Sequence, residues 1–162
     1  MPKIDIGSAP EQNTCGYPAP FHEIARGRFR KRLGDAGRLD QFGVNLCRIA
    51  PGSASSQRHW HEKEDEFVYV VDGELILIED EGDAVLRAGD VAAFKAGVSN
   101  GHHLVNRSSR DALVLEIGTR APSDRATYSD IDMQVVCDES GDRYLHRDGT
   151  PYPPRDDREE PA

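Results

Sequence analysis

Four of the six histidines in the sequence form two close groups, His59 with His61 and His102 with His103. Neutral imidazole is a common metal ligand, so such groups point to a possible metal site. In a β-strand, residues two apart face the same side of the sheet, about 6.6 to 6.8 Å apart along the backbone. His59 and His61 can therefore present two imidazoles side by side to one ion.

Glu66 follows His61 by five residues, after the charged stretch 62–65. We interpret this stretch as a strand end and a bend, so that Glu66 can re-enter the same face from the next strand. Two imidazoles and one carboxylate form a ligand set that leaves coordination positions open for a substrate. The acidic residues inside the bend, Glu62, Glu64 and Asp65, are expected to be solvated rather than ligands.

A fourth ligand has to come from a segment distant in the sequence, and either His102 or His103 can supply it. The other two histidines, His22 and His146, have no paired ligand nearby in the sequence. We expect them to have surface or capping roles.

The segments that must position these residues are short and apolar, separated by Gly, Asp and Pro. Runs of five to eight residues rich in Val, Ile, Leu and aromatics are typical of strands, and their repetition predicts an all-β sandwich or barrel. Asp72-Gly73 predicts one hairpin turn, and Glu81, Gly82 and Asp83 predict the next. The runs lie within 42–52, 66–80, 83–97, 102–109 and 111–119.

The pattern divides the chain into three parts. Residues 1–40 mix Pro, Gly and charges and predict an extended arm with one short strand. Residues 41–118 form the predicted barrel core. Residues 119–162 are a C-terminal extension that packs on the barrel, with a strand near 131–136, a short strand between two turns after it, and disorder at 154–162. Tyr128, Tyr144 and Tyr152 could cover the barrel or reach a neighbouring subunit.

Composition limits the partners. The formal charge of -9 and a pI near 5.1 argue against binding to nucleic acid or to an anionic membrane. The N-terminus has no secretory pattern and no long apolar run is present, so we expect a cytoplasmic protein. Cys15, Cys47 and Cys137 are odd in number and widely spaced, which suits reduced thiols better than disulfides.

Two segments together resemble the signatures of the cupin superfamily, in particular its small single-domain members of cupin type 2. Residues 52–73, GSASSQRHWHEKEDEFVYVVDG, resemble the first signature: a Gly, H-x-H, a Glu after four residues and a Gly after six. Residues 89–106, GDVAAFKAGVSNGHHLVN, resemble the second: G-D, a turn with A-G, and a His separated by three residues from an Asn.

The second segment also departs from the family pattern. Lys95 stands where a Pro is usual, and Asn100 occupies the position where the His is expected. Either the loop is longer and His102 takes that place, or the fourth ligand is missing or is His103. His102 is favoured because it keeps the gap to Asn106 and shares a strand face with it, whereas His103 points the opposite way.

The resemblance implies a double-stranded β-helix, or jelly-roll barrel, with a metal in its mouth, commonly as a homodimer. The implied ligands are His59, His61, Glu66 and His102. This set suits one divalent transition metal, and Fe, Mn, Ni, Co and Zn all fit it.

The fold alone does not identify a reaction. The site favours a metal-dependent enzyme acting on a small polar organic molecule, with dioxygenase, decarboxylase, lyase and isomerase chemistry all open. Catalytic residues beyond the ligands are unknown from the sequence; Tyr69 and Glu116 are possible acids or bases without specific support. The alternatives are a module that binds or senses a small molecule without catalysis, and a structural barrel that has lost its metal.

Overall fold

The structure is a computed structural model that describes residues 3–153. Within these residues the chain forms thirteen strands and two short helical segments. Among them, no helix is long and apolar enough to span a bilayer. In chain order the elements are β1 (Glu11–Gln12), the 3-10 helix η1 (Phe21–Ala25), β2 (Arg28–Arg32), α1 (Leu33–Ala36), β3 (Phe42–Ile49), β4 (His59–His61), β5 (Glu66–Asp72), β6 (Glu74–Glu79), β7 (Gly82–Arg87), β8 (Val91–Phe94), β9 (His103–Val105), β10 (Ala112–Thr119), β11 (Asp124–Tyr128), β12 (Gln134–Asp138) and β13 (Gly141–Leu145).

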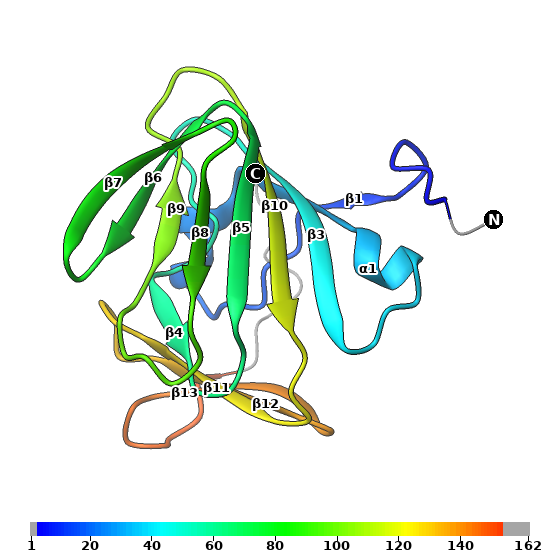
Figure 1. Ribbon diagram of the computed structural model, residues 1–162. Coiled ribbons are helices and arrows are strands. Elements are labelled where there is room, and N and C mark those ends of the chain that lie inside the picture. The colour runs from blue at the N-terminus through cyan, green and yellow to red at the C-terminus, as the bar shows by residue number, and fades with distance from the viewer. Residues whose placement is uncertain (1–2, 154–162) are drawn as a thin grey trace.

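The strands form three antiparallel sheets, which confirms the all-β prediction. A six-stranded sheet has the order β1-β2-β3-β10-β5-β8, and a three-stranded sheet has the order β7-β6-β9. A four-stranded sheet, β13-β12-β11-β4, lies across one end of the molecule, at the bottom of Figure 1. The strand that carries His59 and His61 therefore belongs to a different sheet from the strand that begins at Glu66.

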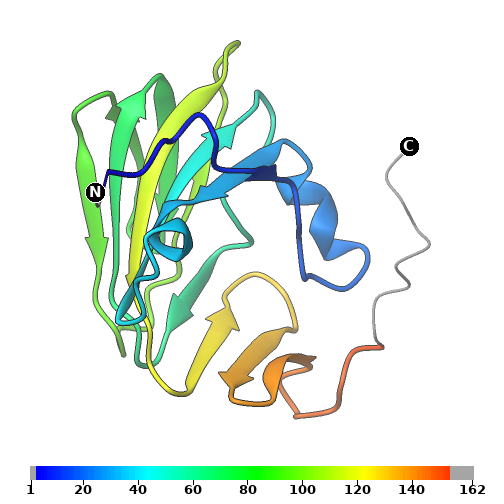
Figure 2. The ribbon, with the colours of Figure 1, turned by 90° about the vertical axis from the view of Figure 1, so that its right-hand side faces the viewer.

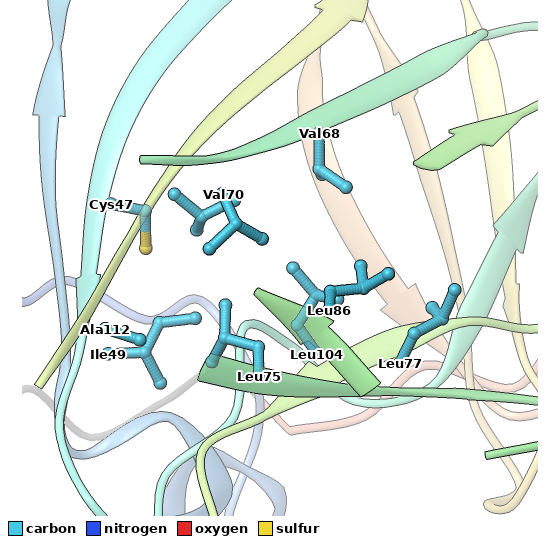
Figure 3. Packing of buried hydrophobic residues seen from close by; sticks show 10 residues of the cluster. Cys47, Ile49, Val68, Val70, Leu75, Leu77, Leu86, Leu104 and Ala112 are labelled. Atoms are coloured by element: carbon cyan, nitrogen blue, oxygen red, sulfur yellow. The ribbon is translucent and has the colours of Figure 1, made fainter. Parts of the chain in front are cut away.

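The hydrophobic core lies between the six-stranded and three-stranded sheets. On β3 every second residue faces inward, and Cys47 and Ile49 pair with Val114 and Ala112 of β10. Side chains from both sheets meet there, as Figure 3 shows for Cys47, Ile49, Val68, Val70, Leu75, Leu77, Leu86, Leu104 and Ala112, and Val114 belongs to the same cluster. This alternation of inward apolar residues is what binds the sheets together.

The predicted hairpin at Asp72-Gly73 is wrong. β5 and β6 lie in different sheets, so the chain turns a corner between the two layers instead of folding back beside itself. Gly73 has φ +84°, and an added Cβ would lie 2.9 Å from Cα of Ala112. The corner and a hairpin both need a positive φ, and local sequence does not distinguish them. The next turn is a hairpin as predicted, because Glu79 pairs with Gly82.

The two ends of the chain add to this framework. Part of the predicted arm forms β2, which pairs with β3 in the six-stranded sheet. The C-terminal extension forms β11, β12 and β13, and β11 pairs with β4. The predicted disorder at residues 154–162 lies outside the described residues.

A second, aromatic core joins these two ends, and Figure 2 shows the extension, in yellow to orange, beside the blue N-terminal segment. Tyr17 contacts Tyr128 and Tyr144 edge-on, and Phe21 contacts Tyr152 in the same way. The three tyrosines of the extension therefore pack within the chain itself.

Candidate metal centre

The centre begins with His59 and His61 on β4. Both side chains project to the same side of this strand, as its two-residue period requires. Their Nε2 atoms lie 3.1 Å apart. β4 is held in place by β11, where Tyr128 pairs with His59 and Ala126 with His61.

Glu66 is brought to these imidazoles by the bend at 62–65. It is the first residue of β5, and its Oε2 lies 3.6 Å from Nε2 of His61 and 3.9 Å from Nε2 of His59. Donor atoms of these three residues all lie within 4.8 Å of one another, so the cluster could hold a metal ion. The sequence predicted this juxtaposition from the strand period and the bend.

The hydrogen bonds at Nδ1 show that the two histidines fit a cation. Nδ1 of His59 lies 2.9 Å from the carbonyl oxygen of Gln57, and Nδ1 of His61 lies 2.5 Å from Oδ2 of Asp124. Both partners accept, so each neutral imidazole carries its proton on Nδ1 and a lone pair on Nε2. Two lone pairs facing each other at 3.1 Å repel unless a positive ion lies between them.

Burial and charge keep the cluster in the protonation state that a metal needs. Burial lowers the pKa of His59 to about 4, which leaves its imidazole neutral near pH 7. Burial alone would raise the pKa of Glu66, but the hydrogen bond from His102 and the neighbouring imidazoles outweigh it and lower that pKa to about 2. Neutral imidazole and ionised carboxylate are the forms that bind metal.

His102 stands on the other side of Glu66. Its Nε2 lies 2.9 Å from Oε2 of Glu66, and its ring stacks on Phe94 with centroids 3.5 Å apart. Its Nδ1 is buried without a hydrogen-bond partner among the described residues. His102 is thus the histidine of the second pair that meets Glu66.

His103 makes its hydrogen bond away from Glu66. Its Nδ1 lies 3.0 Å from the carbonyl oxygen of Ser56, and burial lowers its pKa. Asn100, at the position where the family pattern has its His, instead donates to Glu79 and accepts from the backbone of Asp80. This geometry favours the longer loop, with His102 beside the cluster.

Asp124 is a member of the site that sequence reasoning missed. Its side chain is 2% exposed, and its second oxygen accepts a hydrogen bond from the backbone N–H of Lys63 at 2.8 Å. A carboxylate that orients a metal-binding histidine typically strengthens metal binding 10- to 100-fold. Asp124 reaches His61 only because β11 pairs with β4, a long-range pairing without a local signal.

A cavity of about 340 Å³ adjoins the cluster. Gly43 of β3 and Gly118 of β10 pair with each other and line it, so these two positions place no side chain of their own in the cavity, although the Arg120 side chain lies near Gly43. Glu64, expected to be solvated, lines this cavity instead. Its carboxylate accepts a hydrogen bond from Ala121 N–H at 2.8 Å, and burial raises its pKa.

Of the other residues considered from the sequence, some line the cavity and some lie away from it. Glu116 lines the cavity and lies 2.9 Å from Nε of Arg30, whereas Tyr69 is 41% exposed and does not line it. His22 pairs with its neighbour Glu23, and His146 pairs with Asp132. Neither of these histidines belongs to a group of residues that could hold a metal ion.

The chain is similar to a known protein family and to several solved structures. The family model described as a cupin domain matches residues 45–118. No curated protein matches the chain. The crystal structure of a sugar phosphate isomerase from a cupin superfamily, from Silicibacter pomeroyi, is 47% identical, with a TM-score of 0.91, and the match covers 94% of this chain and 97% of that one.

Two further structures are more distant. A putative sugar phosphate isomerase from Acidithiobacillus ferrooxidans is 26% identical, with a TM-score of 0.71, and the match covers 80% of this chain and 84% of that one. A polyketide cyclase from Streptomyces resistomycificus is 17% identical, with a TM-score of 0.64 and coverage of 82% and 89%, and shares the fold alone. From its identity to the first structure over nearly the whole of both chains, this protein belongs to the cupin superfamily.

Proposed function

We propose that this protein is a metal-dependent isomerase of sugar phosphates. The observation that carries the proposal is the donor cluster of His59, His61 and Glu66 at the wall of an open cavity. The name of the relative at 47% identity, a sugar phosphate isomerase, supports the choice of isomerase among the chemistries that the cluster allows.

The proposed metal is one divalent ion of Fe, Mn, Ni, Co or Zn, held by His59, His61, Glu66 and His102. As a ligand, His102 would carry its proton on Nδ1 instead of on Nε2, which faces Glu66. Three imidazoles and one carboxylate suit all of these ions. Such an ion, when bound, polarises a carbonyl or hydroxyl oxygen of the substrate. Asp124 keeps the proton of His61 on Nδ1 and so keeps Nε2 available to the ion.

Isomerisation of an aldose to a ketose moves one proton from C2 to C1 and another from the C2 hydroxyl to the carbonyl oxygen on C1. The first transfer requires a base within reach of both carbons. Glu64 is the proposed base. Its carboxylate lines the same cavity as the cluster, and the hydrogen bond from Ala121 fixes its position. A positioned carboxylate of this kind typically contributes 10²- to 10⁴-fold to the rate.

Turnover of sugar phosphates, followed by proton NMR in deuterated water, tests the proposal. The protein is purified without a metal-affinity tag, its metal is identified by elemental analysis, and aldose phosphates of four to six carbons are supplied. We expect conversion to the ketose phosphate with deuterium incorporated at the carbon next to the carbonyl. The variant Glu64→Gln should bind the same metal and lose roughly 10²-fold in kcat.

Recovery of every sugar phosphate unchanged and without deuterium, from protein that holds its metal, would contradict the proposal. Tight binding of one of them without conversion would instead indicate a module that senses the small molecule.

The proposed assembly is a homodimer formed through the outer face of the six-stranded sheet. Phe67, Tyr69, Val71 and Val91 are large apolar side chains on this face, each between 38% and 53% exposed. Contiguous exposed apolar surface of this kind is typical of a protein interface. Light scattering should give twice the chain mass, and Tyr69→Arg, which places a charge in the middle of this face, should give the monomer.

A further inference from the structure

Two arginines of β2 reach one backbone oxygen at the cavity wall. Nη1 of Arg28 donates to the carbonyl oxygen of Ser55 at 2.7 Å, and Nη2 of Arg30 lies 3.5 Å from the same oxygen. Arg28 also donates to the carbonyl oxygen of Thr14 at 3.0 Å and is only 5% exposed. Two guanidinium groups are thus gathered at one point, although their like charges repel.

The carboxylates nearby do not balance these two charges. Arg30 pairs with Glu116 at 2.9 Å, whereas the hydrogen bonds of Arg28 go to two backbone carbonyls, and no carboxylate pairs with it among the described residues. A buried cation without a counter-ion is costly, and a well-placed anion relieves the cost. A third arginine of the cavity, Arg120, differs from Arg28 because it is paired with Asp35.

We propose that Arg28 and Arg30 bind the phosphate group of the substrate, an inference that rests on the proposed function. A guanidinium has five N–H donors in a planar arrangement that matches phosphate oxygens. Arg28 uses two of these donors in hydrogen bonds to backbone carbonyls, so the others can bind a phosphate. The net positive charge of the pair adds to that of a metal centre, which suits a dianionic phosphate monoester.

One cavity connects this subsite with the cluster of His59, His61 and Glu66. β2 and β5 are three strands apart, about 14 Å at 4.7 to 4.9 Å a strand, and the long arginine side chains shorten the gap. Gly43 and Gly118 leave the floor between them open. The sugar would lie over these glycines, with its carbonyl end at the cluster and its phosphate at the arginines.

Binding of inorganic phosphate to the metal-loaded protein, measured by calorimetry, tests the subsite independently of turnover. We expect Arg28→Gln and Arg30→Gln each to weaken binding at least tenfold. Circular dichroism of both variants guards against misfolding, because Arg28 donates to two backbone carbonyls and Arg30 pairs with Glu116. Arg120→Gln is the matched control, an arginine of the same cavity that pairs with Asp35 and donates to the carbonyl oxygen of Leu39 instead of Ser55, and it should bind phosphate as the parent does.

The variant His61→Ala separates phosphate held by the arginines from phosphate held by the metal. Retained binding in His61→Ala, together with loss in the two β2 variants, supports the subsite. Loss in His61→Ala with undiminished binding in the arginine variants, or no binding by the parent, overturns it. Phosphate binding without isomerisation would support the subsite and contradict the isomerase proposal. Isomerisation with an unchanged KM in Arg28→Gln would support the isomerase proposal and contradict the subsite.

Discussion

The inner face of the six-stranded sheet has two ends with opposite properties. On β3 and β10, Cys47 and Val114 pair at the apolar end and are fully buried. Two residues away on the same strands, Asn45 pairs with Glu116, and both line the cavity. Since residues two apart share a face, one pair of strands supplies both the core and the site. Stability and chemistry are therefore separated along the strands rather than between elements.

The largest effect should come from a substitution in the candidate metal centre, at the cavity end of the sheet. His61→Ala removes one imidazole, and we expect loss of the metal and a fall in turnover of roughly 10³-fold, because the polarisation that an ion supplies is worth several kcal/mol. Elemental analysis and turnover of a sugar phosphate measure this, with circular dichroism to show that the fold remains.

His146→Ala is the matched control for that variant. This histidine pairs with Asp132 at the surface and stacks on Tyr152, away from the cavity. It should keep the metal and the activity of the parent. Equal metal content in the two variants would show that His61 is not a ligand.

The apolar end should respond in the opposite way. Ile49→Ala, on the same strand as Asn45, removes a fully buried side chain and should reduce the free energy of unfolding by about 2–5 kcal/mol. The metal content of the folded protein should not change. Urea unfolding measures the loss, with Val85→Ala, 43% exposed on β7, as a control expected within about 0.5 kcal/mol. A core variant that lost metal without losing stability would contradict the separation of the two ends.

Sequence reasoning succeeded where the signal is local. His59 and His61 share a face because they are two residues apart, and Glu66 follows a bend whose charges mark it as a bend. The strands of the barrel were visible in the same way, as apolar runs separated by turn residues.

The parts that were missed depend on pairings between distant segments. Asp124 lies in an extension that gave no sign of its pairing with β4, and Arg28 and Arg30 lie in what was predicted to be an arm. The corner at Gly73 was misread because a positive φ serves a hairpin and a crossing between sheets equally well. Local patterns indicate which face a residue takes, and only the register between strands decides what it meets.

A smaller effect should come from the residue behind the cluster. In Asp124→Asn, one oxygen of the carboxylate becomes an amide that donates, so the side chain can no longer accept from both His61 and the backbone of Lys63. We expect metal affinity to fall about 10- to 100-fold, measured by competition with a chelator. Asp138→Asn, at an exposed turn where Asp138 pairs with Arg143, is the control and should leave metal affinity unchanged.

The smallest effect should come from filling the floor of the cavity. In Gly43→Ala the added Cβ would have no atom closer than 3.7 Å, so it meets no clash. A glycine within a strand costs roughly 0.5–1 kcal/mol relative to alanine, and the variant should be more stable by up to that amount. Because the methyl group would occupy space in which we propose that the sugar lies, KM should rise a few-fold while metal content stays the same. A gain in stability with an unchanged KM would mean that the substrate does not cross this floor, and a loss of stability would mean that Gly43 serves the core rather than the site.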